Sequence, residues 1–144
     1  TLPAYFEKMG IQGMKFHKYD SSLCTYCSPL IGMLLTVIAM SYKKPFDNVE
    51  FLTGKRQTPS PDCKKSILVG QCVCALNNDH DGPQEIVKIK GCPPDPEQAA
   101  RALKGIGVDV DPSMLTNMDL LASFILERYK NRPEFDPSFF EITD

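Results

Sequence analysis

Cysteines are the residues of this 144-residue chain whose type and spacing could do chemistry. Four of the six fall in short motifs: a C-x-x-C pair at Cys24 and Cys27, a G-x-C at Cys72, and a Gly-Cys-Pro-Pro run at Cys92. Each motif follows an apolar, strand-like run and comes shortly before or within a helix-start signal. Four thiolates at one place bind a tetrahedral zinc ion or an iron-sulfur cluster. The motifs therefore predict a shared site, provided that the fold brings them together.

The spacing of these cysteines bears on which metal they would hold. Structural zinc sites mostly use two close pairs, because each C-x-x-C makes half of a compact knuckle. Here there is one pair, and Cys72 and Cys92 stand alone. A four-iron cluster is bulkier and can be held from widely separated loops. Helices that begin after Cys27 and Cys92 would also direct backbone N–H groups toward an anionic cluster. The spacing favours a 4Fe-4S cluster, with zinc as the alternative.

Short apolar runs predict the strands that would position the motifs. Residues 49–52, 66–69 and 85–90 are expected as buried parallel strands, and residues 14–19 as the strand that delivers Cys24. The carboxyl ends of parallel strands meet at one edge of a sheet, where α/β folds bind ligands. Four thiols from distant parts of the sequence should then converge at that edge.

Helix-start signals alternate with these strands. Ser28 and Pro29 form an N-cap and N1 pair ahead of the apolar stretch 29–40, and Asp95 and Gln98 form a capping box for a second helix. The first stretch is shorter than the roughly 20 apolar residues of a transmembrane helix, so we expect a buried core helix. A third, amphipathic helix is expected in the last third of the chain, after an N-cap and N1 pair at 111–112.

Length and composition fit a single domain. A chain of 144 residues that is 42% hydrophobic can bury a core without disulfides or metals to staple it. Strands that alternate with helices indicate an α/β fold with a mostly parallel sheet and flanking helices. Because the sequence begins at Thr1 rather than at a methionine, we expect a domain excised from a longer protein or a processed subunit.

Charge and cysteine usage narrow the partners and the location. The net charge is −2, and the 16 basic residues are scattered, which argues against nucleic acid and anionic membranes as partners. No signal peptide is legible, so we expect a cytoplasmic protein with thiols rather than a secreted disulfide framework. Cys63 and Cys74 are expected as small buried hydrophobes or simple surface residues. His17 and His80 are expected as surface or turn histidines rather than ligands.

The cysteine motifs resemble those of two known families. The order C-x-x-C, G-x-C and then G-C-P-P-x-P-E resembles the proximal cluster-binding set of nickel-iron hydrogenase small subunits, and its last element is similar to the cluster subunit of respiratory complex I. In those families the cysteines bind a 4Fe-4S cluster on a flavodoxin-like domain. The resemblance implies the same cofactor and fold here, with Cys24, Cys27, Cys72 and Cys92 as ligands. Only the resemblance favours Cys72 over its neighbour Cys74.

The chain also departs from those families. Residues 73–76 are Val-Cys-Ala-Leu where hydrogenases have paired glycines, and the complex I subunit has adjacent cysteines where Cys24 and Cys27 are separated. Over its whole length, and especially through 2–10 and 19–27, the chain resembles the carboxy-terminal part of a prokaryotic family called domain of unknown function 362, often labelled as iron-sulfur proteins.

The expected function is electron transfer through a 4Fe-4S cluster, in a module rather than in a self-contained enzyme. Its partner would be a redox protein or an upstream domain of the same protein. Two alternatives stay open. One is a structural zinc or non-redox cluster in a protein-binding module. The other is a thiol oxidoreductase that uses Cys24 and Cys27, since a C-x-x-C at a helix start has a lowered thiol pKa.

Overall fold

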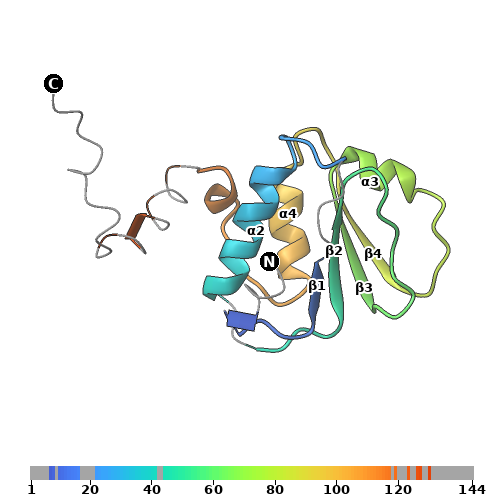
Figure 1. The fold of residues 1–144 in the computed structure, drawn as a ribbon, viewed down its shortest axis with the longest axis horizontal. Helices are drawn as coiled ribbons and strands as arrows, with labels where there is room; N and C mark the ends of the chain where they lie inside the picture. Colours follow the sequence, from blue (N-terminus) through green and yellow to red (C-terminus); the bar gives the residue numbers. More distant parts are fainter. Residues whose placement is uncertain are drawn as a thin grey trace, which may run out of the picture.

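The computed structural model describes residues 7–8, 10–16, 22–41, 44–117, 119, 123, 126–127 and 130. Its elements follow in the order β1 (Met14–Phe16), α2 (Ser28–Ser41), β2 (Val49–Thr53), β3 (Lys65–Val69), α3 (Gln71–Leu76), β4 (Glu85–Ile89), α4 (Pro96–Lys104) and the 3-10 helix η1 (Pro112–Leu115). Strands and helices alternate through most of the chain (Figure 1).

The four strands form one parallel sheet in the order β1-β2-β3-β4. The predicted α/β, flavodoxin-like fold is thus confirmed, with three of the predicted strands within one residue of their expected bounds. Thr53 of β2 is paired with Val69 of β3, and Val69 is level with Ile89 of β4. Three neighbouring strands therefore end at the same height, so whatever follows them shares one edge of the sheet.

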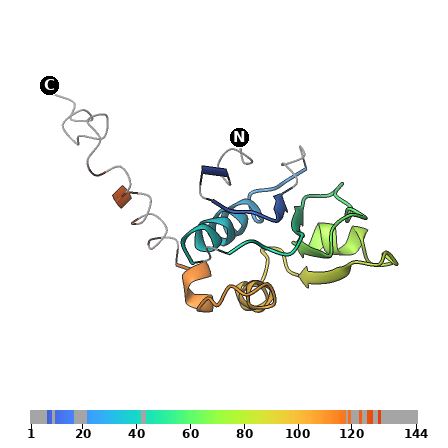
Figure 2. The same ribbon diagram turned by 90° about the horizontal axis from the view of Figure 1, so that it is seen from below.

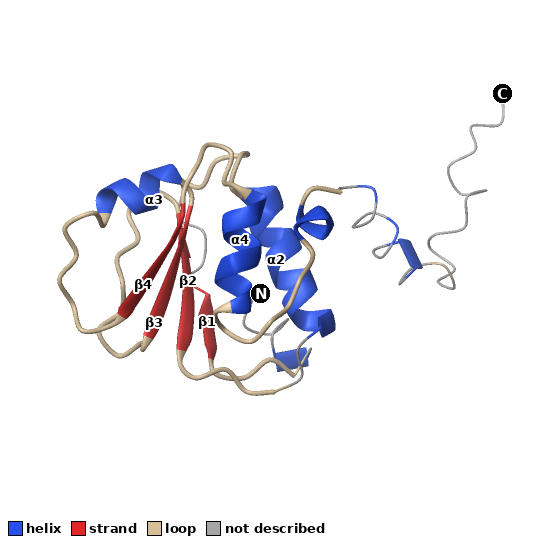
Figure 3. Ribbon diagram, turned by 180° about the vertical axis from the view of Figure 1, so that it is seen from behind, coloured by secondary structure: helices blue, strands red, loops and turns tan. Residues whose placement is uncertain are grey.

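Helices cover both faces of the sheet, as a parallel sheet requires. Alternate strand residues such as Phe51, Ile67 and Ile89 face α2 and α4, whereas Leu52 and Leu68 face α3. Figure 3 shows α2 and α4 on one side of the strands and α3 on the other. In Figure 2, the view from below, η1 lies beside α2 and α4.

The helix α2 is buried on nearly all sides, as its apolar sequence predicts. It starts at Ser28, one residue before the predicted range, and ends at Ser41. Leu34 and Ile38 are fully buried and Leu35 is 6% exposed. No helix in the described part of the chain is long and apolar enough to cross a membrane.

The connection from β2 to β3 contains no helix and is anchored by a buried carboxylate. Glu50 of β2 is fully buried, and its Oε1 accepts the Ser60 backbone N–H at 2.7 Å and the Ser66 hydroxyl at 2.5 Å. The buried carboxyl group is thus hydrogen-bonded, as a buried polar group must be. These bonds hold the predicted loop against the α3 face of the sheet.

The chain leaves β3 and β4 toward opposite faces of the sheet. β3 leads directly into α3, while β4 leads into α4 on the side of α2. Where the chain leaves two neighbouring strands toward opposite faces, room for a ligand remains at the carboxyl edge of an α/β sheet. Of the third predicted helix, only the start is described, as the short η1 capped by Asp111. The positions around His17 and most positions beyond Asn117 lie outside the described residues.

Candidate cysteine site

The predicted cysteines lie at the carboxyl edge of the sheet, three of them on loops and Cys72 in the first turn of α3. Cys72 and Cys92 each stand three residues past the end of a strand, β3 and β4 respectively, and these two strands are neighbours. Cys24 and Cys27 lie in the connection from β1 to α2, and Cys27 directly precedes the first turn of that helix. The placement expected from strand ends is therefore what the described residues show.

Glycine at the end of β3 makes room for the Cys27 thiol. Gly70 has φ +106° and ψ 153°, a backbone conformation that residues with a side chain rarely adopt. A Cβ built at Gly70 would lie 2.6 Å from the Cys27 sulfur, far inside van der Waals contact. Glycine thus serves both the turn and the approach of the thiol. Cys27 packs against the end of β3 because no side chain occupies that space.

Backbone hydrogen bonds join the turn just before Cys72 to the segment just before Cys92. The N–H of Gly70 donates to the carbonyl of Ile89 at 2.9 Å, and the N–H of Gln71 donates to the carbonyl of Gly91 at 3.0 Å. The residues that bond in the second pair immediately precede the two cysteines. The β3–β4 ladder therefore continues past the strands, and it holds the two single cysteines side by side.

A separate contact ties the C-x-x-C loop to the end of β2. The backbone N–H of Lys55 donates to the Ser22 hydroxyl at 2.7 Å. Within the loop, the N–H groups of Cys27 and Ser28 both reach the Cys24 carbonyl at 3.3 Å. This turn leads directly into α2.

The Cys24 thiol is exposed and points at backbone donors. The N–H groups of Tyr26 and then Cys27 hydrogen-bond to its sulfur and lower its pKa below the ordinary value. Hydrogen bonds to a thiolate favour the charged form, which is the reason for this direction. The lowered pKa favours the thiolate, the form of cysteine that binds metals and attacks disulfides.

The Cys27 thiol has the opposite character. Burial, followed by the neighbouring thiol of Cys24 and, to a smaller extent, that of Cys92, raises its pKa to about 11, while the Thr53 hydroxyl opposes this shift. A cation among these thiols would remove the repulsion that disfavours ionisation.

A small cavity lies among three of the four thiols. Cys24, Cys27 and Cys72 line it together with Lys55 and Gly70, and its volume of about 20 Å³ has room for roughly one water. Cys92 does not line it. Across the described ranges, no group of three or more histidine, cysteine or acidic side chains is placed to hold a metal ion. The backbone thus gathers the thiols at one edge, while their side chains are not directed at one point.

The two remaining cysteines are packed into the protein. Cys74 is 3% exposed on the α3 face, where its thiol lies 3.7 Å from the carbonyl of Leu68 and burial raises its pKa. Cys63 is 4% exposed, and burial followed by the charge of Glu50 raises its pKa to about 11. Both act as the small buried residues that were expected. The burial of Cys74 also favours exposed Cys72 as the ligand from α3.

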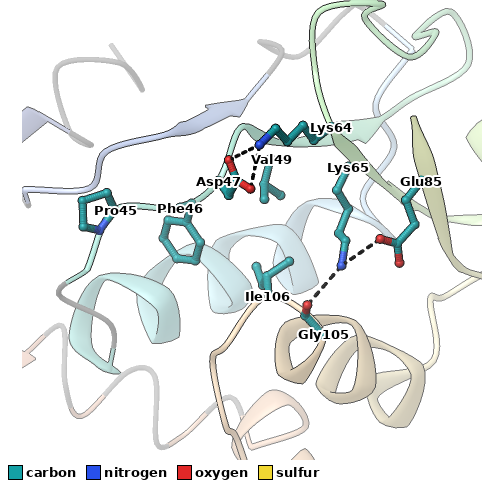
Figure 4. Close-up of a pocket in the computed structure, with 9 residues that line it drawn as sticks. All are labelled: Pro45, Phe46, Asp47, Val49, Lys64, Lys65, Glu85, Gly105 and Ile106. Carbon is teal, nitrogen blue, oxygen red and sulfur yellow. Dashed lines mark hydrogen bonds and ion pairs between the residues drawn. The ribbon is translucent and has the colours of Figure 1, made fainter. Parts of the chain in front are cut away.

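Another cavity lies at the opposite edge of the sheet, and none of the cysteines lines it. It measures about 440 Å³ and is lined by the amino-terminal ends of strands and the carboxyl end of α4 (Figure 4). Its charged groups pair with one another: Lys64 with Asp47 at 2.8 Å, and Lys65 with Glu85 at 3.2 Å. Lys65 also donates to the carbonyl of Gly105 at 3.1 Å. These four charged side chains are thus paired with one another, so none of them is left to bind a charged ligand.

Comparison of the chain with protein-family models, with curated proteins and with solved structures finds no match. No family is therefore shown for it. The function has to be argued from the cysteines and from the contacts that surround them.

Proposed function

We propose that this domain binds one 4Fe-4S cluster through Cys24, Cys27, Cys72 and Cys92 and transfers electrons through it. The observation that carries the proposal is the placement of all four at one edge of a parallel sheet, on the loop before α2, the first turn of α3 and the loop after β4. Thiolates are the usual ligands of such clusters. A bound cluster would supply one-electron transfer, and the chain would supply its ligands and its surroundings.

The surroundings of the thiols fit an anionic cluster. Backbone N–H groups already reach the Cys24 sulfur, and hydrogen bonds to cluster sulfurs are one way that proteins set a reduction potential. The 14-residue helix α2 begins just after Cys27, so its positive dipole end faces the site. Cys24, Cys72 and Cys92 are exposed and free of the packing that fixes Cys63 and Cys74.

The same exposure defines how a partner would reach the cluster. A site with three exposed ligands at a sheet edge is open to a redox partner protein or to an upstream domain of the same protein. All six cysteines are free thiols, which suits a reducing, cytoplasmic location.

Anaerobic reconstitution with iron and sulfide tests the proposal. The parent and Cys74→Ala should each acquire broad visible absorption that dithionite bleaches, with four irons per chain. Cys92→Ser and Cys72→Ser should lose most of it while their far-UV circular dichroism stays native. Cys74→Ala is the matched control, because it removes a thiol that is buried on the α3 face of the sheet.

Two outcomes would overturn the cluster. One is a parent that takes up no iron while folded. The other is a colourless parent that binds zinc stoichiometrically, and more tightly than it binds iron, which would establish a structural metal in a binding module. Equal iron content in parent and Cys92→Ser would remove Cys92 from the site.

A second candidate function is thiol–disulfide exchange, and the asymmetry of the C-x-x-C pair favours it. Cys24 is exposed with a lowered pKa, whereas Cys27 is half-buried with its pKa raised to about 11. That is the arrangement of an attacking thiolate and a resolving thiol at a helix start. The Cys24 thiolate would attack a substrate disulfide, release one thiol and form a mixed disulfide. Cys27 would then attack the Cys24 sulfur of that mixed disulfide, release the second thiol and leave a Cys24–Cys27 disulfide.

Variants outside the pair separate the two functions. Cys72→Ser should lose most of the iron uptake but leave the reduction of a disulfide substrate unchanged. If instead the parent fails to reduce a small disulfide substrate faster than Cys24→Ser, the exchange function is excluded.

A further inference from the structure

The start of α4 is fastened to the end of β4 by a ring of hydrogen bonds. Gln98 Oε1 accepts the backbone N–H of Lys90 at 2.9 Å, and Gln98 Nε2 donates to Asp95 Oδ2 at 3.0 Å. The backbone N–H of Asp95 donates to the Lys90 carbonyl at 3.0 Å, and Asp95 Oδ1 accepts the N–H of Glu97 at 2.9 Å. Both backbone groups of Lys90 are thereby bonded to the first turn of α4.

This ring differs from an ordinary capping box. In a capping box the side chain at the third helical position bonds the N-cap N–H, which here belongs to Asp95. Gln98 instead reaches the N–H of Lys90, eight residues earlier in the chain. Lys90 directly follows β4, the last strand in the sheet order, so the described part of the chain offers its N–H no next strand to bond. Gln98 supplies an acceptor that the sheet cannot.

The ring encloses the loop that carries Cys92. Inside it, Gly91 and Pro94 form a bridge, and a Cβ at Gly91 would lie 2.5 Å from the carbonyl oxygen of Pro93, so the turn is tight. The Gly91 carbonyl in turn accepts the N–H of Gln71, next to Cys72. A shift of the ring would therefore move Cys92 first and Cys72 second.

We infer that Gln98 is a positioning residue that holds Cys92 in place as a metal ligand. The inference rests on the proposed cluster site and adds a residue that the cysteine motifs do not reveal. Outer groups that orient ligands typically contribute 10- to 100-fold to metal affinity. Cys24 and Cys27 belong to a different loop, held by α2 and Ser22, so the effect should be confined to the half of the site that carries Cys72 and Cys92.

The test compares Gln98→Met with Lys104→Met. Methionine has nearly the helix propensity of glutamine and can neither accept nor donate these bonds, so α4 should persist. Lys104 is an exposed position at the other end of the same helix and serves as the control. Anaerobic cobalt(II) titration, followed by thiolate-to-cobalt absorption, should show affinity about 10- to 100-fold weaker in Gln98→Met and unchanged in Lys104→Met.

Amide hydrogen exchange provides a readout that needs no metal. The Lys90 and Asp95 N–H groups should exchange faster in metal-free Gln98→Met than in the parent, while the Cys27 and Ser28 N–H groups keep their parent rates. Gln98→Glu retains an acceptor for Lys90 and should preserve more of the Lys90 protection than Gln98→Met does.

The outcomes distinguish this inference from the proposed function. Unchanged cobalt affinity and unchanged Lys90 exchange in Gln98→Met would refute the positioning role, whatever the parent does with iron. A parent that binds neither iron nor cobalt would refute the metal site and the ligand role with it. Faster exchange at Lys90 would then show that Gln98 only fixes the loop.

Discussion

Replacing Gly70 with alanine should disturb both the fold and the cysteine site. The backbone at this position has φ +106° and ψ 153°, and the new Cβ would lie 2.6 Å from the Cys27 sulfur. Two separate costs follow, one from the backbone conformation and one from the contact. Each has its own magnitude and its own readout.

The backbone cost can be bounded from the conformation alone. A residue with a side chain in this glycine-only region costs about 1–3 kcal/mol. The contact adds about 1–3 kcal/mol if Cys27 stays in place, which is typical of overpacking. If Cys27 instead rotates away, the contact cost falls, but the thiol leaves its half-buried position. Its pKa should then drop from about 11 toward the ordinary cysteine value.

Urea unfolding under reducing conditions measures the first effect, and the pH profile of Cys27 alkylation, followed by peptide mass mapping, measures the second. Gly10→Ala is the matched control. Gly10 also has a positive φ, +70°, but a Cβ there would meet nothing within 4 Å. It should cost about 1–2 kcal/mol from the left-handed conformation and leave Cys27 untouched.

The two variants must therefore differ in a defined way. If Gly70→Ala unfolds at the same urea concentration as Gly10→Ala and the Cys27 alkylation profile matches that of the parent, the close approach at Gly70 does not exist. The account of how β3 makes room for Cys27 would then be wrong.

Three further predictions follow from glycine, burial and thiol ionisation. Gly32 lies inside α2 and is exposed, with open space where a Cβ would be. Gly32→Ala should therefore raise the free energy of unfolding, measured by urea titration, by about 0.5–1 kcal/mol. A lower free energy of unfolding would contradict this reasoning. Burial raises the pKa of Cys63 from 9.0 to about 11, so the folded state holds this proton more tightly, and stability should fall as pH rises from about 9 to 11. The free energy of unfolding of the parent, minus that of Cys63→Ala, should fall by about 2 kcal/mol across that window. Parallel curves of unfolding free energy against pH would show that burial has no such effect. Alkylation of Cys24 should begin at lower pH than that of an ordinary cysteine, and Cys27 should react only near pH 11; coincident profiles would remove the asymmetry of the pair.

The strands and most helices were predictable because their signals are local. Continuous apolar runs marked β2, β3 and β4, and residues 49–52 and 66–69 fall inside the observed strands. Asp95 and the proline after it marked the start of α4, which begins at Pro96 as expected. In each case the sequence carries the information within a few residues, through burial or capping.

The tertiary details of the site were not predictable in this way. The glycines after β2, β3 and β4 are visible in the sequence, but nothing local shows that Gly70 faces Cys27, 43 positions away. The six-residue helix α3 is too short to show a clear helical repeat of apolar residues, so the sequence predicts only that Cys72 lies near a helix start. Gln98 was readable as part of a capping box, whereas its bond to Lys90 depends on how α4 sits against β4.

The strand order has a consequence for how a cell would make this domain. Synthesis on the ribosome supplies the C-x-x-C pair first, Cys72 next and Cys92 last, and the strands join the sheet in that same order along the chain. Parallel pairing needs crossovers, so no single hairpin can present the four thiols early, and β4 must dock before Cys92 reaches the edge. During that interval the first pair is available to zinc or to oxidation. Delivery of the proposed cluster therefore has to follow completion of the sheet, which makes maturation a step after folding rather than a nucleus for it.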